Sequence, residues 1–147
     1  MNKVVLMGRL TRDPEVRYSQ NSPEPIAIAR YTLAVRRKFK KDGETDDFIP
    51  CVAFRRDGEF AEKYLKKGML IAVSGRIQVR SFEDQQGQKR WMTEVVIEEQ
   101  DFAESKATFE GRESRDSGRG EPQQQSGYDQ DGFSAISESI DDDDLPF

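Results

Sequence analysis

The fold prediction depends on a period-two alternation in Asp47-Phe48-Ile49-Pro50-Cys51-Val52-Ala53-Phe54-Arg55-Arg56. Successive side chains of a β-strand point to opposite faces, so residues 48, 50, 52 and 54 share one face and residues 49, 51, 53 and 55 the other. The second face is small and apolar. The first carries the large rings of Phe48 and Phe54 beside a basic neighbourhood. Each ring can belong to the core or contact a ligand, and the alternation leaves both interpretations open.

Alternating segments on both sides of this stretch predict further strands over residues 3–11, 26–37, 70–82 and 90–102. Turn signals at Asp42-Gly43 and at residues 84–87 predict two hairpins. Residues 57–67 form the one convincing helix, with Asp57 as N-cap and Gly68 just beyond its end. About five strands, with the helix between the third and the fourth, predict an all-β, five-stranded Greek-key barrel of the OB type.

Aromatic and basic side chains occur together in the predicted strands and hairpins. Phe39 lies in the basic run 36–41, and Phe82 shares a strand face with Arg76 and Arg80. A single-stranded nucleic acid needs cations for its phosphates and flat faces for its unstacked bases. The pattern therefore predicts a surface that binds a single strand. Trp91 can stack a base or pack inward, and inward packing is the preferred interpretation.

Charge divides the 147 residues into two unequal parts. Residues 1–106 hold 20 Lys and Arg against 17 Asp and Glu, a net charge of +3, whereas residues 107–147 hold 3 against 11, a net charge of −8. The overall charge of −5 therefore conceals a mildly basic front part, which suits an anionic polymer. We expect a barrel domain over 1–105, a disordered Gly/Ser/Gln/Asp-rich linker over 106–140 and an acidic tip over 141–147.

The composition excludes several kinds of chemistry. The chain has no histidine, which excludes His-dependent triads, His-ligated zinc and imidazole acid–base catalysis. Its single cysteine, Cys51, cannot form an intramolecular disulfide and is expected to be a small buried residue. No segment approaches the roughly 20 apolar residues of a membrane span. We expect a soluble intracellular protein that is not an enzyme and needs no metal or cofactor, although abundant carboxylates leave a metal-dependent nuclease formally open.

The sequence ends in Asp141-Asp142-Asp143-Asp144-Leu145-Pro146-Phe147. This tip joins two apolar side chains, a proline and an α-carboxylate to four aspartates. We predict that Phe147 enters an apolar pocket of partner proteins while the carboxylate meets an Arg or Lys. A merely solvated acidic run is the simpler alternative.

These features resemble the single-stranded DNA-binding proteins of bacteria and their phages. The matching segments are residues 2–10 (NKVVLMGRL), 13–18 (DPEVRY), 32–35 (TLAV), 64–68 (YLKKG), 86–88 (QGQ), 93–95 (TEV) and 145–147 (LPF). The resemblance implies an OB-fold homotetramer that coats single-stranded DNA without sequence preference during replication, recombination and repair. It also implies a cytoplasmic, nucleoid-associated protein that recruits partner enzymes through residues 141–147. An OB-fold RNA-binding module is the alternative.

The resemblance also implies site residues. Base-stacking rings fall on Phe39, Phe48, Phe54 and Phe82, all phenylalanine where tryptophan is common in the family. Basic contacts are expected at Lys3, Arg9, Arg36, Arg37, Arg55, Arg56, Arg76 and Arg80, and the partner-protein site at Asp141, Asp142, Asp143, Asp144, Leu145, Pro146 and Phe147. Pro50 departs from the family, because many relatives place a polar or basic residue there.

Overall fold

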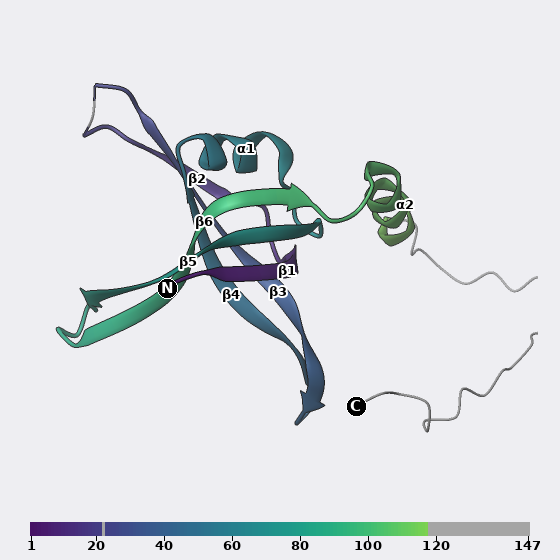
Figure 1. Cartoon of the computed structure of the whole chain (residues 1–147), viewed down its shortest axis with the longest axis horizontal. Coiled ribbons are helices and arrows are strands. Elements are labelled where there is room, and N and C mark those ends of the chain that lie inside the picture. The colour runs from purple at the N-terminus through teal and green to yellow at the C-terminus, as the bar shows by residue number, and fades with distance from the viewer. Residues whose placement is uncertain (22, 118–147) are drawn as a thin grey trace, which may run out of the picture.

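The computed structural model describes residues 1–21 and 23–117. Its elements are, in chain order, β1 (Val4–Leu10), β2 (Glu15–Ser19), β3 (Ile26–Lys41), β4 (Glu44–Phe54), α1 (Arg56–Tyr64), β5 (Leu70–Glu83), β6 (Lys89–Phe102) and α2 (Lys106–Asp116) (Figure 1). All five predicted strands are present. The sequence analysis predicted no strand over residues 15–19 and therefore missed β2.

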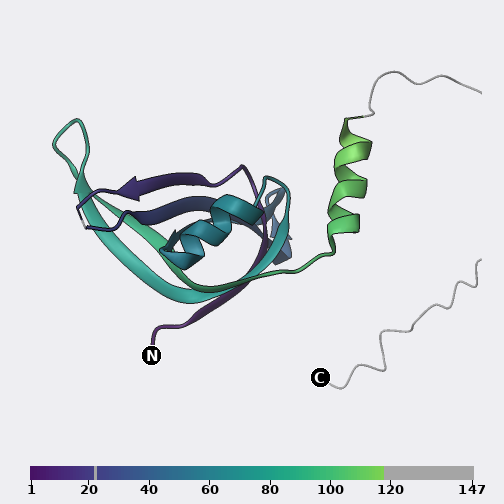
Figure 2. The same cartoon turned by 90° about the horizontal axis from the view of Figure 1, so that it is seen from above.

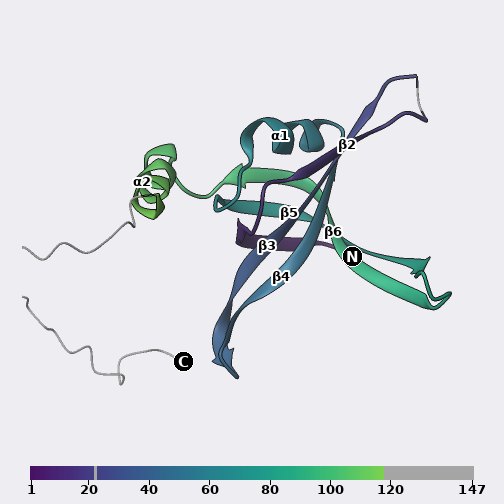
Figure 3. The same cartoon turned by 180° about the vertical axis from the view of Figure 1, so that it is seen from behind.

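The strands form one closed sheet, which confirms the predicted OB-fold. Neighbouring strands follow the order β1-β5-β6-β4-β3-β2, and a further pairing of β1 with β3 closes a barrel of five strands. β2 extends the sheet beyond β3. The β3–β4 and β5–β6 hairpins leave the barrel as two separate arms (Figures 1 and 3). Helix α1 lies along the barrel, whereas α2 stands apart from it (Figure 2).

Alternate residues of the strands build the barrel core, as the period-two pattern predicted. On β4 the inner residues are Cys51 and Ala53, which are 2% and 0% exposed. The buried core cluster consists of Leu10, Ala29, Tyr31, Leu33, Cys51, Ala53, Ala61, Leu65, Ile71, Val73, Val95 and Ile97. Two of these, Ala61 on α1 and Leu65 just after it, attach the helix to the barrel.

Two glycines fix the geometry of the hairpin arms. The β5–β6 register shifts between Ser74 and Gly75, and a Cβ at Gly75 would lie 2.1 Å from the carbonyl oxygen of Val96. Only glycine permits this close approach at the register shift. In the β3–β4 arm, Asp42 and Gly43 have φ of 54° and 80° and form a tight turn. Strands therefore continue through most of residues 38–46, where a longer loop was expected.

Helix α1 begins one residue earlier than the predicted 57–67 and ends three residues earlier, at Tyr64, so Gly68 does not directly follow it. Arg55 occupies the N-cap position with φ of 57°, and its backbone N–H donates to the carbonyl oxygen of Ala27 at 2.8 Å. Asp57 is therefore wrong as the predicted cap and lies in the first turn, where a carboxylate still favours the helix dipole.

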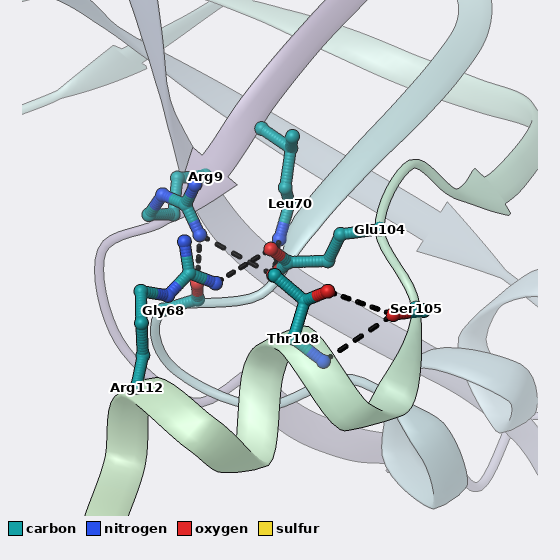
Figure 4. Close-up of polar contacts among 7 residues, drawn as sticks. All are labelled: Arg9, Gly68, Leu70, Glu104, Ser105, Thr108 and Arg112. Carbon is teal, nitrogen blue, oxygen red and sulfur yellow. Dashed lines mark hydrogen bonds and ion pairs between the residues drawn. The ribbon is translucent and has the colours of Figure 1, made fainter. Parts of the chain in front are cut away.

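Helix α2 occupies residues where the sequence predicted a linker without regular structure. The hydroxyl of Ser105 caps it by accepting from the N–H of Thr108 at 3.3 Å. Glu104 ties this segment to the barrel by accepting from the N–H of Leu70 at 3.0 Å, from Arg9 at 3.3 Å and from Arg112 at 2.6 Å (Figure 4). The rest of the predicted linker, from residue 118, and the acidic tip lie outside the described residues.

Burial of Glu104 would by itself raise its pKa, but the Leu70 N–H and the Arg112 guanidinium outweigh burial and hold the pKa below its usual value. The carboxylate therefore stays ionised at neutral pH.

Neither described helix has the length and hydropathy needed to cross a membrane.

Candidate nucleic-acid interface

Strands β3, β4, β6 and β5 share one continuous outer face. Paired residues point to the same side of a sheet. Ala34 pairs with Phe48, Val52 with Val96, and Phe82 with Arg90. Following this register and the alternation along each strand, the outer face carries Phe48, Phe54, Phe82, Arg30, Arg36, Arg76 and Arg80. The structure thus brings together three of the four predicted stacking rings and three of the eight predicted basic residues.

The rings on this face are exposed. Phe48 is 66% exposed, Phe82 45% and Phe54 37%, so none belongs to the core of this chain. Phe39 lies on the β3–β4 arm near its turn, 77% exposed, with Lys38 Nζ 5.6 Å from its ring centroid. Large apolar side chains in such positions need a partner more than buried ones do.

The turn of the β5–β6 arm is held by Asp84. Its carboxylate accepts from Arg90 Nε at 2.7 Å and from the backbone N–H groups of Gln88 and Gln86 at 2.9 and 3.0 Å. The hydrogen bond from Arg90, followed by that from Gln88, lowers the pKa of Asp84. Because Arg90 pairs with Phe82, this turn also fixes the end of the strand that presents the ring.

Several predicted basic contacts already have carboxylate partners within the chain. Lys3 meets Glu98 at 2.7 Å and Arg36 meets Asp46 at 3.7 Å. Arg37 meets Asp47 at 2.6 Å and Glu44 at 2.8 Å. These pairs reduce the free positive charge of the surface, so stacking has to carry more of the affinity for a nucleic acid.

The remaining predicted cations differ in position. Arg55 and Arg56 directly follow Phe54, at the junction of β4 and α1. Arg37 lies on the same side of the sheet as Asp47, opposite to the face that carries Phe48. Arg9 donates to the carbonyl oxygen of Gly68 at 2.7 Å and pairs with Glu104 near α2, so the structure does not bring it to the arms.

The sequence reasoning missed two residues at the centre of the outer face. Glu94 is 3% exposed, and its carboxylate meets Arg30 at 3.4 Å and Arg80 at 3.2 Å. Arg30 could have been found from the alternation of β3, since it is a charged residue between the inward-facing Ala29 and Tyr31. Glu94 carries no such signal, because an acidic residue on a strand is usually solvated.

Cys51 and Trp91 give opposite outcomes. Cys51 is buried as predicted, and this burial, with a smaller effect of Glu94, raises the pKa of its thiol to about 12. Trp91 is 66% exposed, so the prediction that it packs inward is wrong. Trp91 is on the side of β6 that faces the core within the barrel. However, Trp91 pairs with Ser81 on the arm, beyond the barrel, where Val79 on the same side is also exposed.

A cleft of about 1380 Å³ lies elsewhere, between α1 and α2, where Leu65, Lys66 and Phe109 are among its lining residues. A nucleic-acid strand that lies across a β-sheet needs no such enclosure, so we place the interface on the outer face.

The described residues include no group of three or more His, Cys, Asp or Glu side chains placed to hold a metal ion. Exposed rings with interspersed guanidinium groups can stack bases and contact phosphates.

Comparisons with known proteins find a matching family and similar sequences. The model of the single-strand binding protein family matches residues 1–103. Among similar proteins is the single-stranded DNA-binding protein of Clostridium perfringens, 52% identical over 105 residues, which cover 71% of this chain and 67% of the relative. That of Streptococcus pyogenes serotype M1 is 50% identical over 113 residues, 76% of this chain and 68% of the relative. That of Halalkalibacterium halodurans is 41% identical over 174 aligned positions, covering 100% of this chain and 99% of the relative.

Proposed function

Because the chain belongs to the single-strand binding protein family, we propose that it binds single-stranded DNA on the outer face of β3–β6 without sequence preference. The carrying observation is the exposure of Phe48, Phe54 and Phe82 on one face of the barrel. Every base has a π-face, so stacking is tolerant of sequence, and each stacked ring contributes roughly 1–3 kcal/mol. The role is binding and not catalysis.

Phosphate contacts add a smaller, salt-dependent share of the affinity. Arg55, Arg56 and Arg76 make no ion pair with the described residues, whereas Lys3, Arg36, Arg37 and Arg80 do. A DNA strand must therefore compete with internal carboxylates for four of these seven cations. We expect a shallow dependence of affinity on salt concentration.

The proposed assembly is a homotetramer around which DNA wraps. Apolar side chains on β1 support an interface between copies, since Val5 and Met7 are 74% and 59% exposed. The β5–β6 arm adds Val79 and Trp91, which are 57% and 66% exposed on the side away from the outer face. Exposed apolar side chains of this kind are typical of protein–protein contacts.

In the cell, the proposed protein coats and protects single-stranded DNA during replication, recombination and repair, in the cytoplasm with the nucleoid. The tip, residues 141–147, is proposed to recruit the enzymes of these processes. Its four aspartates favour the encounter electrostatically, and Phe147 with its carboxylate provides the specific anchor. Deleting Phe147 is expected to abolish recruitment while DNA binding persists.

Binding of a labelled dT oligomer, followed by anisotropy while solution mass is measured across a salt series, tests this function. We expect a tetramer that holds the strand tightly with a shallow salt slope, and weaker binding of a matched rU oligomer. Equal affinity for the two oligomers would favour an RNA-binding module instead. A monomer with weak, steeply salt-dependent binding would refute the stacking-led proposal.

A further inference from the structure

Glu94 is unusual because it is a buried carboxylate on the outer face instead of in the core. It is 3% exposed, and among residues 1–21 and 23–117 no other charged residue is buried. It pairs with Gln78 across β5–β6, beside the outward-facing Val96. A buried charge is costly unless it is paired, so its partners must hold it in place.

Two arginines from different strands converge on this carboxylate. Arg80 Nε lies 3.2 Å from Oε1, and Arg30 Nη1 lies 3.4 Å from Oε2. Arg30 belongs to β3 and Glu94 to β6, so the side chain of Arg30 must cross β4, which lies between these two strands. It crosses at Val52, which pairs with Arg30 on one side and with Val96 on the other, and which is 0% exposed.

Each arginine retains unused binding capacity. Both side chains are 42% exposed, and a guanidinium carries several N–H donors. Arg30 uses one donor on Glu94, and Arg80 makes one further contact, to Met92 Sδ at 3.5 Å. The distances to the carboxylate exceed the roughly 2.7–2.9 Å of the strongest charge-assisted hydrogen bonds. Two cations share one anion, so the cluster keeps a net positive charge.

The cluster lies among the three rings. Extending the β4–β6 register by two residues places Glu94 level with Pro50, which separates Phe48 from Phe54 along β4. Phe82 lies on β5, on the other side of β6, two positions along the strand from Arg80. Neighbouring β-strands are about 4.8 Å apart, so a DNA strand that stacks on rings of both β4 and β5 must cross β6, the strand that carries Glu94.

We propose that Arg30 and Arg80 form a phosphate-binding subsite in which one backbone phosphodiester of the bound strand bridges both guanidinium groups. Glu94 is a positioning residue that holds the two side chains over β6 before the strand arrives. The carboxylate itself repels the phosphate, so its contribution is orientation and not charge. This inference rests on the proposed function and names the phosphate subsite within it.

The test compares two double variants that remove the same charge, Arg30→Gln/Arg80→Gln and the control Lys63→Gln/Lys66→Gln at the α1 side. For a dT oligomer, we expect the first variant to bind roughly tenfold or more weakly, with a log–log salt slope shallower by about 0.7 for the lost phosphate. The control should match the wild type. Equal effects of the two variants would overturn the subsite, whereas failure of the wild type to bind at all would overturn the proposed function.

Glu94→Gln tests positioning in both backgrounds. If Glu94 orients the arginines, the variant binds several-fold more weakly although its net charge is more positive, and it has no further effect when both arginines are already glutamine. Tighter binding would show that Glu94 only repels DNA. An equal loss of affinity in the Arg30→Gln/Arg80→Gln background would show that Glu94 has a general structural role. Thermal unfolding of each variant checks the fold, and the arginine comparison stands even if Glu94→Gln does not fold.

Discussion

The two faces of strand β4 carry side chains of opposite character although they alternate along one short segment. On the inner face, Cys51 and Ala53 are small and buried, whereas on the outer face Phe48 and Phe54 are large and exposed. An ordinary half-buried strand has its bulk inside and its polar residues outside. The reversal on β4 supports the proposal that its outer face contacts a ligand.

The inner residues are small because α1 packs very close to the sheet. A Cβ at Gly58 would lie 2.8 Å from the carbonyl oxygen of Ala27 and 3.0 Å from that of Ala53. Large side chains on the inner face would push the helix away. The inner face therefore determines stability and the outer face determines binding, and substitutions on each should separate these two quantities.

The largest effect is expected from truncating the inner face. Leu33 is 0% exposed and pairs with Ile49, so Leu33→Ala leaves a cavity in the barrel. The free energy of unfolding should fall by roughly 2–5 kcal/mol. Chemical denaturation measures the loss, while affinity for a dT oligomer, measured well below the new melting temperature, should stay near the wild-type value. A parallel loss of affinity in the folded variant would break the separation of the two faces.

A smaller effect, on binding alone, is expected from the outer face. Phe82→Ala should weaken single-stranded DNA binding by roughly 1–3 kcal/mol, because a stacking ring is lost, with little change in melting temperature. Phe109→Ala on α2 removes the same ring away from the outer face and serves as the control. Similar losses in both variants would mean that the position of the ring does not matter.

Alkaline pH should weaken the inner face selectively. Burial raises the pKa of Cys51 from 9.0 to about 12, and burial likewise raises that of its pairing partner Tyr31. Above pH 9 the unfolded chain loses the thiol proton, and above pH 10 it loses the tyrosine proton, while the folded chain keeps both. The stability that Cys51 provides below pH 9 is therefore lost as pH rises toward 12, and that of Tyr31 begins to be lost above pH 10. The expected loss is on the order of 1 kcal/mol per pH unit for each group.

Denaturant titrations from pH 8 to pH 11 measure this loss. Cys51→Ala removes the thiol's share and should have a shallower decline over the same range. Identical pH profiles for the wild type and the variant would show that the thiol is not shielded from water in the folded protein.

The smallest effect is expected outside both faces. Glu104→Gln weakens the contacts that join Arg9, Leu70 and Arg112, but both arginines are exposed to water, so the expected loss is only about 1 kcal/mol. Helix content from residues 106–116 should decrease in circular dichroism, while melting temperature and DNA affinity change little. A large loss of barrel stability would show that α2 belongs to the same cooperative unit.

Local periodicity was sufficient to predict much of this organisation. The alternation of residues 47–56 predicted which side chains of β4 share a face, and the structure shows that the face with Cys51 and Ala53 lines the core. These features depend on neighbouring residues alone. The β2 strand was missed because five polar-rich residues become a strand only by pairing with β3.

Contacts between distant segments could not be predicted from the sequence. The meeting of Arg30, Arg80 and Glu94 depends on three strands lying side by side, and the attachment of α2 depends on Arg9, nearly a hundred residues earlier. Trp91 was placed inward by its alternation, but the arm continues beyond the barrel, so no core exists there to cover it.

The most direct test of the account compares Phe48→Ala with Ile49→Ala, neighbours on opposite faces of β4. Unfolding free energy and affinity for dT and mixed-sequence oligomers are measured for both. Phe48→Ala should weaken binding to every sequence by a similar factor with stability nearly unchanged, whereas Ile49→Ala should lower stability and leave affinity near the wild-type value. Loss of affinity for one sequence only in Phe48→Ala, or equal loss in both variants, would contradict the assignment of the outer face to single-stranded DNA.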